Sequence, residues 1–172
     1  MLSIADLLRA DPSLPGGEPS GADPLVDDDA LEGAAVLDAR LDPRGATGAV
    51  LFDLRTALAH AKAVAGLLVV RGVWDFQCAV AEPGAAPGAL TVVSSTPIDA
   101  QDAFTLRIGT APRAAVVLSG ESAEFYVLDV PSAGDEVPVP GAVTTVRRSQ
   151  PHWGSDCSVL AAFHRKRSAE PV

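Results

Sequence analysis

Apolar side chains occupy every second position in a series of short runs between residues 35 and 130. In residues 35–42, for example, Leu37, Ala39 and Leu41 alternate with charged side chains. A period of two places one face of a β-strand in a dry interior and the other face in water. The pattern therefore predicts a mainly β protein.

Runs of this kind recur at intervals of roughly ten residues, with short connections rich in Gly and Pro between them. Such spacing favours antiparallel pairing of neighbouring strands. We expect an antiparallel meander that forms a sandwich or open barrel. The expected strands are residues 35–42, 48–55, 66–73, 74–80, 90–95, 104–110, 113–118 and 123–130.

Gly72 separates two different strand patterns. The run at 66–73 is almost wholly aliphatic, whereas the run that follows alternates apolar and polar side chains. This change predicts a bulge or bend at Gly72, where the chain passes from a strand buried on two faces to a strand buried on one. Farther along, the short SGES connection between 113–118 and 123–130 predicts a hairpin.

Other segments have local patterns of their own. Residues 2–9 have one apolar face and predict a short N-terminal helix, and residues 56–63 suit a short helix or helical turn. Pro97 predicts a turn, and residues 143–146 an edge strand. Residues 155–166 fit either a capped helix or a strand, and we favour the strand.

Residues 11–38 contain eight acidic side chains and no basic one, and Pro and Gly are frequent in the first part of this stretch. Such a composition buries too little apolar surface to offset the entropy of ordering. We therefore expect a short helix and a flexible acidic arm in residues 1–32, the arm covering 11–32. One β-rich domain follows in residues 33–167, with a disordered tail at 168–172.

The formal net charge of −9 limits the classes of partner. Nucleic-acid binding requires a clustered positive field, which this sequence does not offer. A basic protein partner is compatible with the charge, although an acidic balance also serves solubility alone. No run reaches the roughly 18 apolar residues of a membrane span, and the first residues include Asp6 and Arg9. The sequence therefore predicts a cytoplasmic protein with no membrane contact.

Known catalytic and cofactor motifs are missing from the sequence. It has no G-x-S-x-G nucleophile elbow, no G-x-x-x-x-G-K-[ST] phosphate loop and no G-x-G-x-x-G loop. The three aspartates at 27–29 lack the alternate ligands of a calcium loop, and Cys78 and Cys157 lack zinc-ligand spacing. We therefore predict no enzymatic activity, no cofactor and no metal, and assign no catalytic, cofactor-binding or metal-ligating residue.

The histidines and cysteines have an ordinary structural interpretation. His60, His152 and His164 have no other ligand type at helical spacing, which favours surface or loop positions. Cys157 and His164 would act as nucleophile and base only with an orienting group and an oxyanion site, and the sequence reveals neither.

Four charged residues lie at polar positions of neighbouring expected strands: Asp53, Arg55, Arg71 and Asp75. If these strands pair in sequence order, the four form a cross-strand ladder, which is more typical of a salt-bridged solvent face than of acid–base catalysis.

The two tryptophans are expected in different environments. Trp74 alternates with polar residues and is predicted to anchor the core, whereas Trp153 is predicted to plug a loop. An exposed Trp153 beside His152 would instead suit a protein interface.

The runs VLDARLD, GAVLFDLRTAL, LLVVRGVWDF, LTVVSS, FTLRIG and AEFYVLDV follow one another within residues 35–131. A polar-faced strand is followed by an apolar core strand, a strand from Val73 to Phe76 and a late acidic and aromatic strand at Glu124–Asp129. This order resembles small β-rich bacterial proteins of the immunity-like type, which are encoded near polymorphic toxins. The shared motifs concern packing, so they bear on fold more than on activity.

The resemblance implies a non-enzymatic protein that neutralises a partner by covering its active surface, and acidic side chains suit a basic partner. It transfers no binding residue to this chain, and the acidic arm has no place in the pattern. The alternatives are a β-rich accessory or scaffolding domain, a small-ligand-binding domain and a cysteine-dependent enzyme. The sequence fixes neither the partner nor the oligomeric state.

Overall fold

A computed structural model describes residues 2–9, 21–60, 63–80, 90–100, 103–111, 114–134 and 150–165 of the chain. A two-residue strand, β1 (Leu2–Ser3), leads directly into a short helix, α1 (Ile4–Leu7). The other strands are β2 (Ala35–Asp42), β3 (Thr47–Asp53), β4 (Ala65–Arg71), β5 (Asp75–Val80), β6 (Leu90–Ala100), β7 (Ala103–Ala111), β8 (Ala114–Gly120), β9 (Ser122–Asp129) and β10 (Asp156–Arg165).

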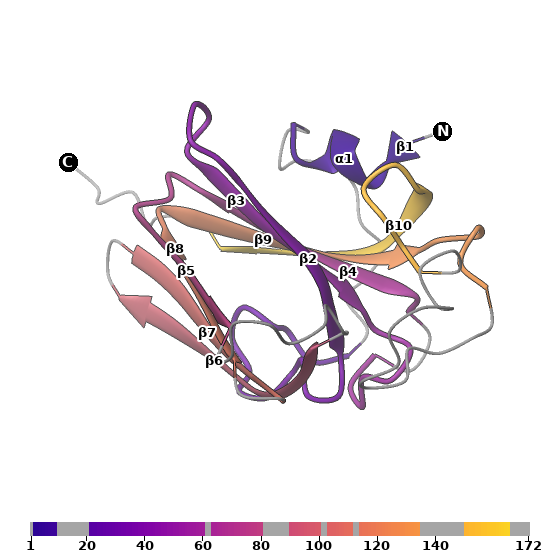
Figure 1. Cartoon of the computed structure of the whole chain (residues 1–172), viewed down its shortest axis with the longest axis horizontal. Helices are drawn as coiled ribbons and strands as arrows, with labels where there is room; N and C mark the ends of the chain where they lie inside the picture. Colours follow the sequence, from indigo (N-terminus) through magenta and orange to yellow (C-terminus); the bar gives the residue numbers. More distant parts are fainter. Residues whose placement is uncertain are drawn as a thin grey trace.

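Within these ranges, ten strands form one antiparallel sheet in the order β1-β10-β9-β4-β3-β2-β6-β7-β8-β5. The sheet divides where β2 meets β6, because these two strands pair only at Ala35 with Thr91 and Val36 with Leu90. We call β10, β9, β4, β3 and β2 the first half-sheet, and β6, β7, β8 and β5 the second. The second half-sheet lies at the lower left of Figure 1. The expected mainly β, antiparallel fold is confirmed, as an open sheet that does not close into a barrel.

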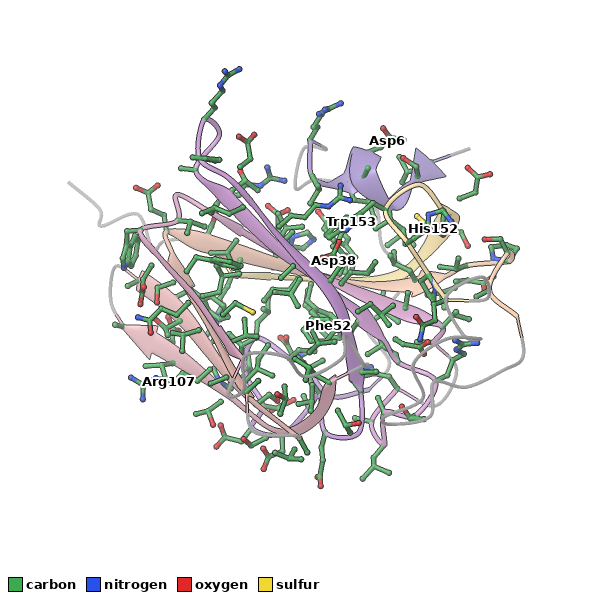
Figure 2. All side chains as sticks on the ribbon, viewed as in Figure 1. Asp6, Asp38, Phe52, Arg107, His152 and Trp153 are labelled. Atoms are coloured by element: carbon green, nitrogen blue, oxygen red, sulfur yellow. The ribbon has the colours of Figure 1, made fainter. Side chains whose placement is uncertain are left out.

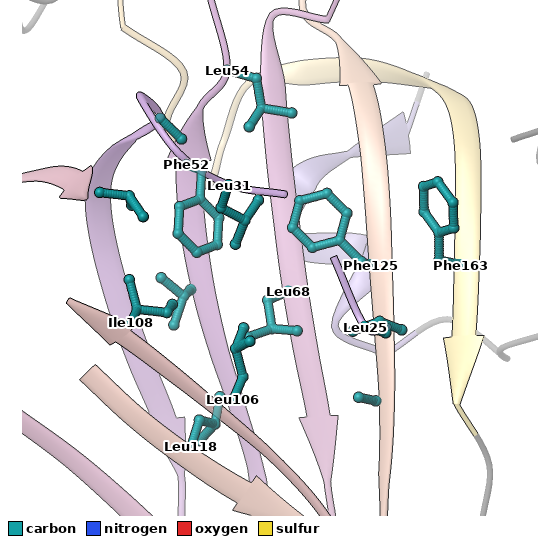
Figure 3. Close-up of a cluster of buried hydrophobic side chains, with 14 of the residues drawn as sticks. Leu25, Leu31, Phe52, Leu54, Leu68, Leu106, Ile108, Leu118, Phe125 and Phe163 are labelled. Carbon is teal, nitrogen blue, oxygen red and sulfur yellow. The ribbon is translucent and has the colours of Figure 1, made fainter. Parts of the chain in front are cut away.

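The main hydrophobic core lies between the two half-sheets. Phe52, Leu68 and Phe125 from the first half-sheet form one cluster with Leu106 and Leu118 from the second (Figure 3). The ring centroids of Phe52 and Phe125 are 6.1 Å apart. Each large apolar side chain buried in this way contributes roughly 1.5–3 kcal/mol to folding, so this interior is the main source of stability.

A second hydrophobic cluster covers the opposite face of the first half-sheet. Leu67 and Tyr126 lie in this cluster together with Ile4 and Trp153. The backbone N–H of Ile4 donates to the carbonyl of Ser155 at 3.0 Å, which joins the N-terminal segment to the loop before β10. The central strands β3, β4 and β9 are therefore buried on both faces, and this explains why β4 is almost wholly aliphatic.

The chain crosses between the half-sheets at Gly72 and Gly120. Gly72 has a φ of +62°, a conformation that side chains with a Cβ rarely adopt. A Cβ added to Gly120 would lie 2.7 Å from the carbonyl oxygen of Arg71. The backbone N–H of Glu121 donates to that same carbonyl at 2.9 Å, so the two crossings lie side by side. The bend predicted at Gly72 is confirmed.

The hairpin predicted between 113–118 and 123–130 is wrong. β8 pairs with β7 and β5, whereas β9 pairs with β4 and β10. The short SGES connection therefore joins two layers instead of two paired strands. A connection of this length allows either arrangement, and only the long-range pairing decides between them.

Residues 21–32 pack against the second half-sheet, so the prediction of an extended or mobile arm is wrong for this part. Leu25, Ala30 and Leu31 are buried, and Leu25 and Leu31 belong to the main core. Their burial stabilises the segment despite its acidic and Pro-containing composition. Residues 11–20 of the predicted arm lie outside the described residues.

Several local predictions have clear outcomes. The N-terminal helix is present as α1, and residues 155–166 form a strand, β10. Residues 56–60 form turns and no helix, while 61 and 62 lie outside the described residues. The turn predicted at Pro97 is wrong, because Pro97 lies within β6 opposite Leu106. β6 has a β2 partner only at its start, so the missing N–H of proline is tolerated farther along that edge.

The predicted edge strand at 143–146 and the tail at 168–172 lie outside the described residues. In the part of the chain that the structure describes, no helix has the length and apolar character needed to cross a membrane.

Candidate interaction surfaces

An acidic segment, residues 23–32, lies beside β6, and we call it the acidic turn. Its residues Asp27, Asp28, Asp29 and Glu32 are exposed, and the segment contains no basic residue. Like charges that are not neutralised within their own segment create a negative local potential.

Hydrogen bonds attach the acidic turn to β6. The backbone N–H of Asp29 donates to the carbonyl of Ser95 at 2.7 Å, and the N–H of Ser95 donates to Asp29 Oδ1 at 3.0 Å. The N–H of Leu31 donates to Ser95 Oγ at 3.3 Å. Asp29 has a φ of +57°, a left-handed conformation that aspartate tolerates better than most residues. The backbone that carries the carboxylates is thus fixed to the sheet.

Carboxylates crowd one another at the start of the acidic turn. The backbone N–H of Asp23 donates to Asp27 Oδ2 at 2.8 Å, and the N–H of Leu25 donates to Asp23 Oδ1 at 2.9 Å. Burial raises the pKa of Asp23; the hydrogen bond from Leu25 opposes this change, and the charge of Asp27 adds to it. A positive group placed here would relieve the repulsion between the two carboxylates.

His60 lies behind the acidic turn. Its side chain is in a loop, as predicted, but it is buried, with 4% of its surface exposed. The ring stacks on Phe125 with a centroid distance of 6.2 Å, and Nε2 has no hydrogen-bond partner among the described residues. Burial lowers the pKa of His60, and a hydrogen bond to the backbone of Ala30 opposes this. A neutral, packed imidazole fits a structural role.

Exposed apolar side chains surround the acidic turn and form what we call its apolar rim. Val26 belongs to the turn itself, Leu58 is 78% exposed, and Val93 is exposed on β6. The N–H of Leu58 donates to the carbonyl of Glu32 at 3.2 Å, which places Leu58 beside the turn. Apolar groups next to charged ones are typical of protein-binding surfaces.

The two tryptophans differ in burial. Trp74 is 56% exposed, so its predicted role as a core anchor is wrong. Trp153 is 6% exposed and plugs the loop before β10, as predicted. Its Nε1 donates to Asp38 Oδ2 at 2.6 Å (Figure 2), and the guanidinium carbon of Arg40 lies 4.5 Å from the ring centroid. The exposed tryptophan is thus the one beside edge strand β5.

Cys157 and His164 do not form a nucleophile–base pair. They lie seven residues apart on β10, which at ~3.3 Å per residue separates them by about 23 Å. His164 instead makes an edge contact with Tyr126, with ring centroids 6.1 Å apart. Burial, with the charges of nearby aspartates, raises the pKa of the Cys157 thiol to about 11, the opposite of activation.

The predicted cross-strand ladder is also wrong. Asp53 forms an ion pair with Arg55, with Nη2 and Oδ2 2.5 Å apart. Arg71 forms one with Glu124 of β9, with Nε and Oε1 2.8 Å apart. Asp75 lies on β5 and accepts a hydrogen bond from a side chain of its own strand. The four residues fall into separate contacts because β4 pairs with β9, not with β5.

The sequence did not single out Glu124, which centres a buried polar cluster. The hydroxyl of Tyr126 donates to Glu124 Oε2 at 3.0 Å, and Arg71 Nη1 donates to the carbonyl of Leu8 at 3.2 Å. Burial, followed by the charge of Glu124, raises the pKa of Tyr126. The cluster ties the N-terminal segment to β4 and β9, which is a structural role.

His152 lies in an exposed loop before β10, as predicted. His152 Nδ1 accepts the backbone N–H of Gly154 at 3.2 Å. Over the described ranges, no group of three or more His, Cys, Asp or Glu side chains is placed to hold a metal ion.

No family model, no curated protein and no solved structure matches this chain. Its function is therefore inferred from its own residues. Two surfaces are candidates: the acidic turn with its apolar rim, and the edge of β5 beside Trp74.

Proposed function

We propose that this chain is a non-enzymatic binding protein that holds a basic protein partner on the acidic turn and, like an immunity protein, neutralises that partner by covering its active surface. The supporting observation is the attachment of Asp29 to Ser95 of β6 through two hydrogen bonds. Because the backbone is fixed, the carboxylates of Asp28 and Glu32 need little further ordering when a partner binds.

Charge and apolar surface have separate parts in this proposal. The carboxylates of the acidic turn attract a basic surface, speed the encounter and disfavour acidic competitors. Val26, Leu58 and Val93 then supply apolar area that a partner can cover. Charged rims mainly affect rate and specificity, whereas buried apolar contacts supply more of the affinity.

A catalytic function has less support in the described residues. Cys157 has a raised thiol pKa, which keeps it protonated at neutral pH. His60 is buried with its ring against Phe125, where a substrate does not reach it. A binding role requires neither group to react.

The proposal is tested by affinity capture from a lysate of the source organism, followed by titration of each purified captured protein. A variant carrying Asp28→Lys and Glu32→Lys reverses two exposed charges of the acidic turn. We expect it to weaken binding of a basic partner by about tenfold or more, with the wild-type affinity falling as salt is added. The control carries Asp42→Lys and Asp156→Lys, which make the same charge change at exposed positions elsewhere.

Two results would contradict the proposal. In one, no basic protein is captured; in the other, both variants weaken binding equally, which points to net charge alone. Neutralisation is checked by assaying the partner's own activity with and without this chain. An undiminished activity in the saturated complex would exclude the immunity-like role.

A further inference from the structure

Most exposed edges of this sheet carry a feature that hinders pairing with another chain. An unpaired edge offers free backbone N–H and C=O groups, and bulges, prolines or charges commonly block it. β10 is covered at its start by β1 and shifts register between Val159 and Ala161. β2 and β6 also have register shifts, and Pro97 lies within β6.

β5 differs from these edges. It pairs with β8 without a register shift, from Asp75 opposite Ser119 to Val80 opposite Ala114. Its sequence, DFQCAV, contains no Pro, Lys or Arg, and Asp75 is its one charged residue. Among the described strands, only β8 pairs with it. Its outer edge thus has the features of a strand that accepts another strand.

The two residues that precede β5, Val73 and Trp74, are held in place by hydrogen bonds, and Trp74 exposes apolar surface. The N–H of Val73 donates to the carbonyl of Ala46 at 2.8 Å, and that of Trp74 donates to the carbonyl of Ser119 at 3.2 Å. Trp74 is 56% exposed, and Cys78 is exposed as well. A strand whose start is already held by hydrogen bonds loses little conformational entropy when it pairs, and the exposed Trp74 beside it adds apolar area that a second chain can cover.

We infer that β5 pairs with the β5 strand of a second copy of this chain, antiparallel about a two-fold axis. A two-fold interface brings the same surface from both copies together, and one edge strand supplies both sides of it. With the axis between Gln77 and Cys78, Asp75 lies opposite Val80 of the second copy. Like charges do not meet across this joint.

The distribution of charge favours a second copy over a basic partner at this edge. The chain carries a net charge of −9, which opposes self-association in general. The acidic turn, however, is bonded to β6, and β6 and β5 are the two outer strands of the second half-sheet. β5 itself contributes a single carboxylate, so it offers a basic partner little attraction and a second copy little repulsion.

The size of the contact limits its strength. A joint between two six-residue strands is small beside the 1,200–2,000 Å² or so that stable interfaces bury. The dimer is therefore concentration-dependent and in rapid exchange with monomer. Its formation does not rest on the binding of a basic partner to the acidic turn.

Sedimentation velocity over a wide range of protein concentration, in reducing buffer, tests this inference. The wild-type chain is expected to shift from monomer to dimer as its concentration rises. Cys78→Lys and Gln77→Lys each add two positive charges at the two-fold axis, and both are expected to weaken dimerisation by about tenfold or more. The control, Ile98→Lys, places the same side chain at an exposed position of β6 and is expected to dimerise like the wild type.

Circular dichroism and thermal unfolding establish that each variant is folded. A wild-type chain that stays monomeric at every concentration would overturn the inference. So would a dimer that both β5 variants form as readily as the wild type, because the contact would then lie elsewhere.

Discussion

The two half-sheets contain similar aliphatic residues, yet they differ in how many faces are covered. In β4 the side chains from Ala65 to Val70 are buried without interruption. In β7 buried side chains alternate with partly buried or exposed ones from Phe104 to Thr110. Uninterrupted burial requires a layer on each face of a sheet, whereas alternation leaves one face in water. The central strands of the first half-sheet, β3, β4 and β9, thus form an interior scaffold, and the second half-sheet is an outer layer.

Both candidate surfaces belong to the second half-sheet. The acidic turn is bonded to β6, and the β5 edge with Trp74 is the last strand in the sheet order. If the two proposals hold, stability comes mainly from the central strands of the first half-sheet, and binding takes place on the second. Substitutions inside the first half-sheet should lower stability, and exposed substitutions on the second should leave it nearly unchanged.

The largest effect is expected from Phe125→Ala in β9. Phe125 is fully buried and contacts the rings of Phe52 and His60. Loss of its ring leaves a cavity between the half-sheets, so the free energy of unfolding should fall by about 3–5 kcal/mol. Urea unfolding measures the change. A loss below about 1 kcal/mol would mean that the scaffold is not closely packed there.

A smaller effect is expected from Glu124→Gln. Gln keeps the shape of the side chain but leaves Arg71 facing a neutral amide in a largely buried site, with Arg71 itself 28% exposed. The loss should be about 1–3 kcal/mol. Asp99→Asn, in the exposed pair with Arg165, is the control and should cost no more than about 1 kcal/mol. Equal losses would contradict the distinction between the buried interior and the exposed surface.

The positions of the strands could be predicted from the sequence because the period-two pattern is local. Leu106 and its neighbours at alternate positions show which face is dry without reference to any other strand. The layering could not be predicted in this way. Gly120 looks like part of a hairpin turn, and only the pairing of β8 with β7 and of β9 with β4 identifies a crossing.

His60 should give the protein a pH-dependent stability. Its folded pKa is lowered from 6.5 by burial, so the unfolded chain binds more protons in the window below pH 6.5. The contribution is fully present above pH 6.5 and is lost as the pH falls toward the folded pKa. His60→Phe keeps a ring against Phe125 and should flatten this part of the curve of unfolding free energy against pH. An unchanged slope would assign the dependence to other groups.

The candidate surfaces were the part that sequence patterns described least well. Acidic composition averaged over residues 11–32 concealed Leu25 and Leu31, whose burial orders the second part of that stretch. Trp74 lies just before a strand whose sequence alternates apolar and polar residues, but β5 is at the end of the sheet, so core packing does not extend over it, and Trp74 and Cys78 are exposed. Whether each of these residues is buried or exposed depends on strands that are distant in the sequence, so no short sequence segment contains the information.

The smallest effect is expected from Arg107→Ala on β7. Arg107 is exposed on the outer layer and extends away from the ribbon in Figure 2. Because no covering layer packs on it among the described residues, the free energy of unfolding should change by about 0.5 kcal/mol or less. Chemical denaturation beside Phe125→Ala measures both. A loss approaching that of Phe125→Ala would show that a further layer covers this face.

Residue-resolved hydrogen exchange tests most directly whether the acidic turn is a fixed part of the second half-sheet. The amides of Asp29 and Gly33 donate to carbonyls of β6 at 2.7 and 3.0 Å. We predict that both exchange as slowly as the amide of Val92, which donates to Ala34 from β6. Exchange of Asp29 and Gly33 at the rate of an unstructured chain, while Val92 stays protected, would contradict the account.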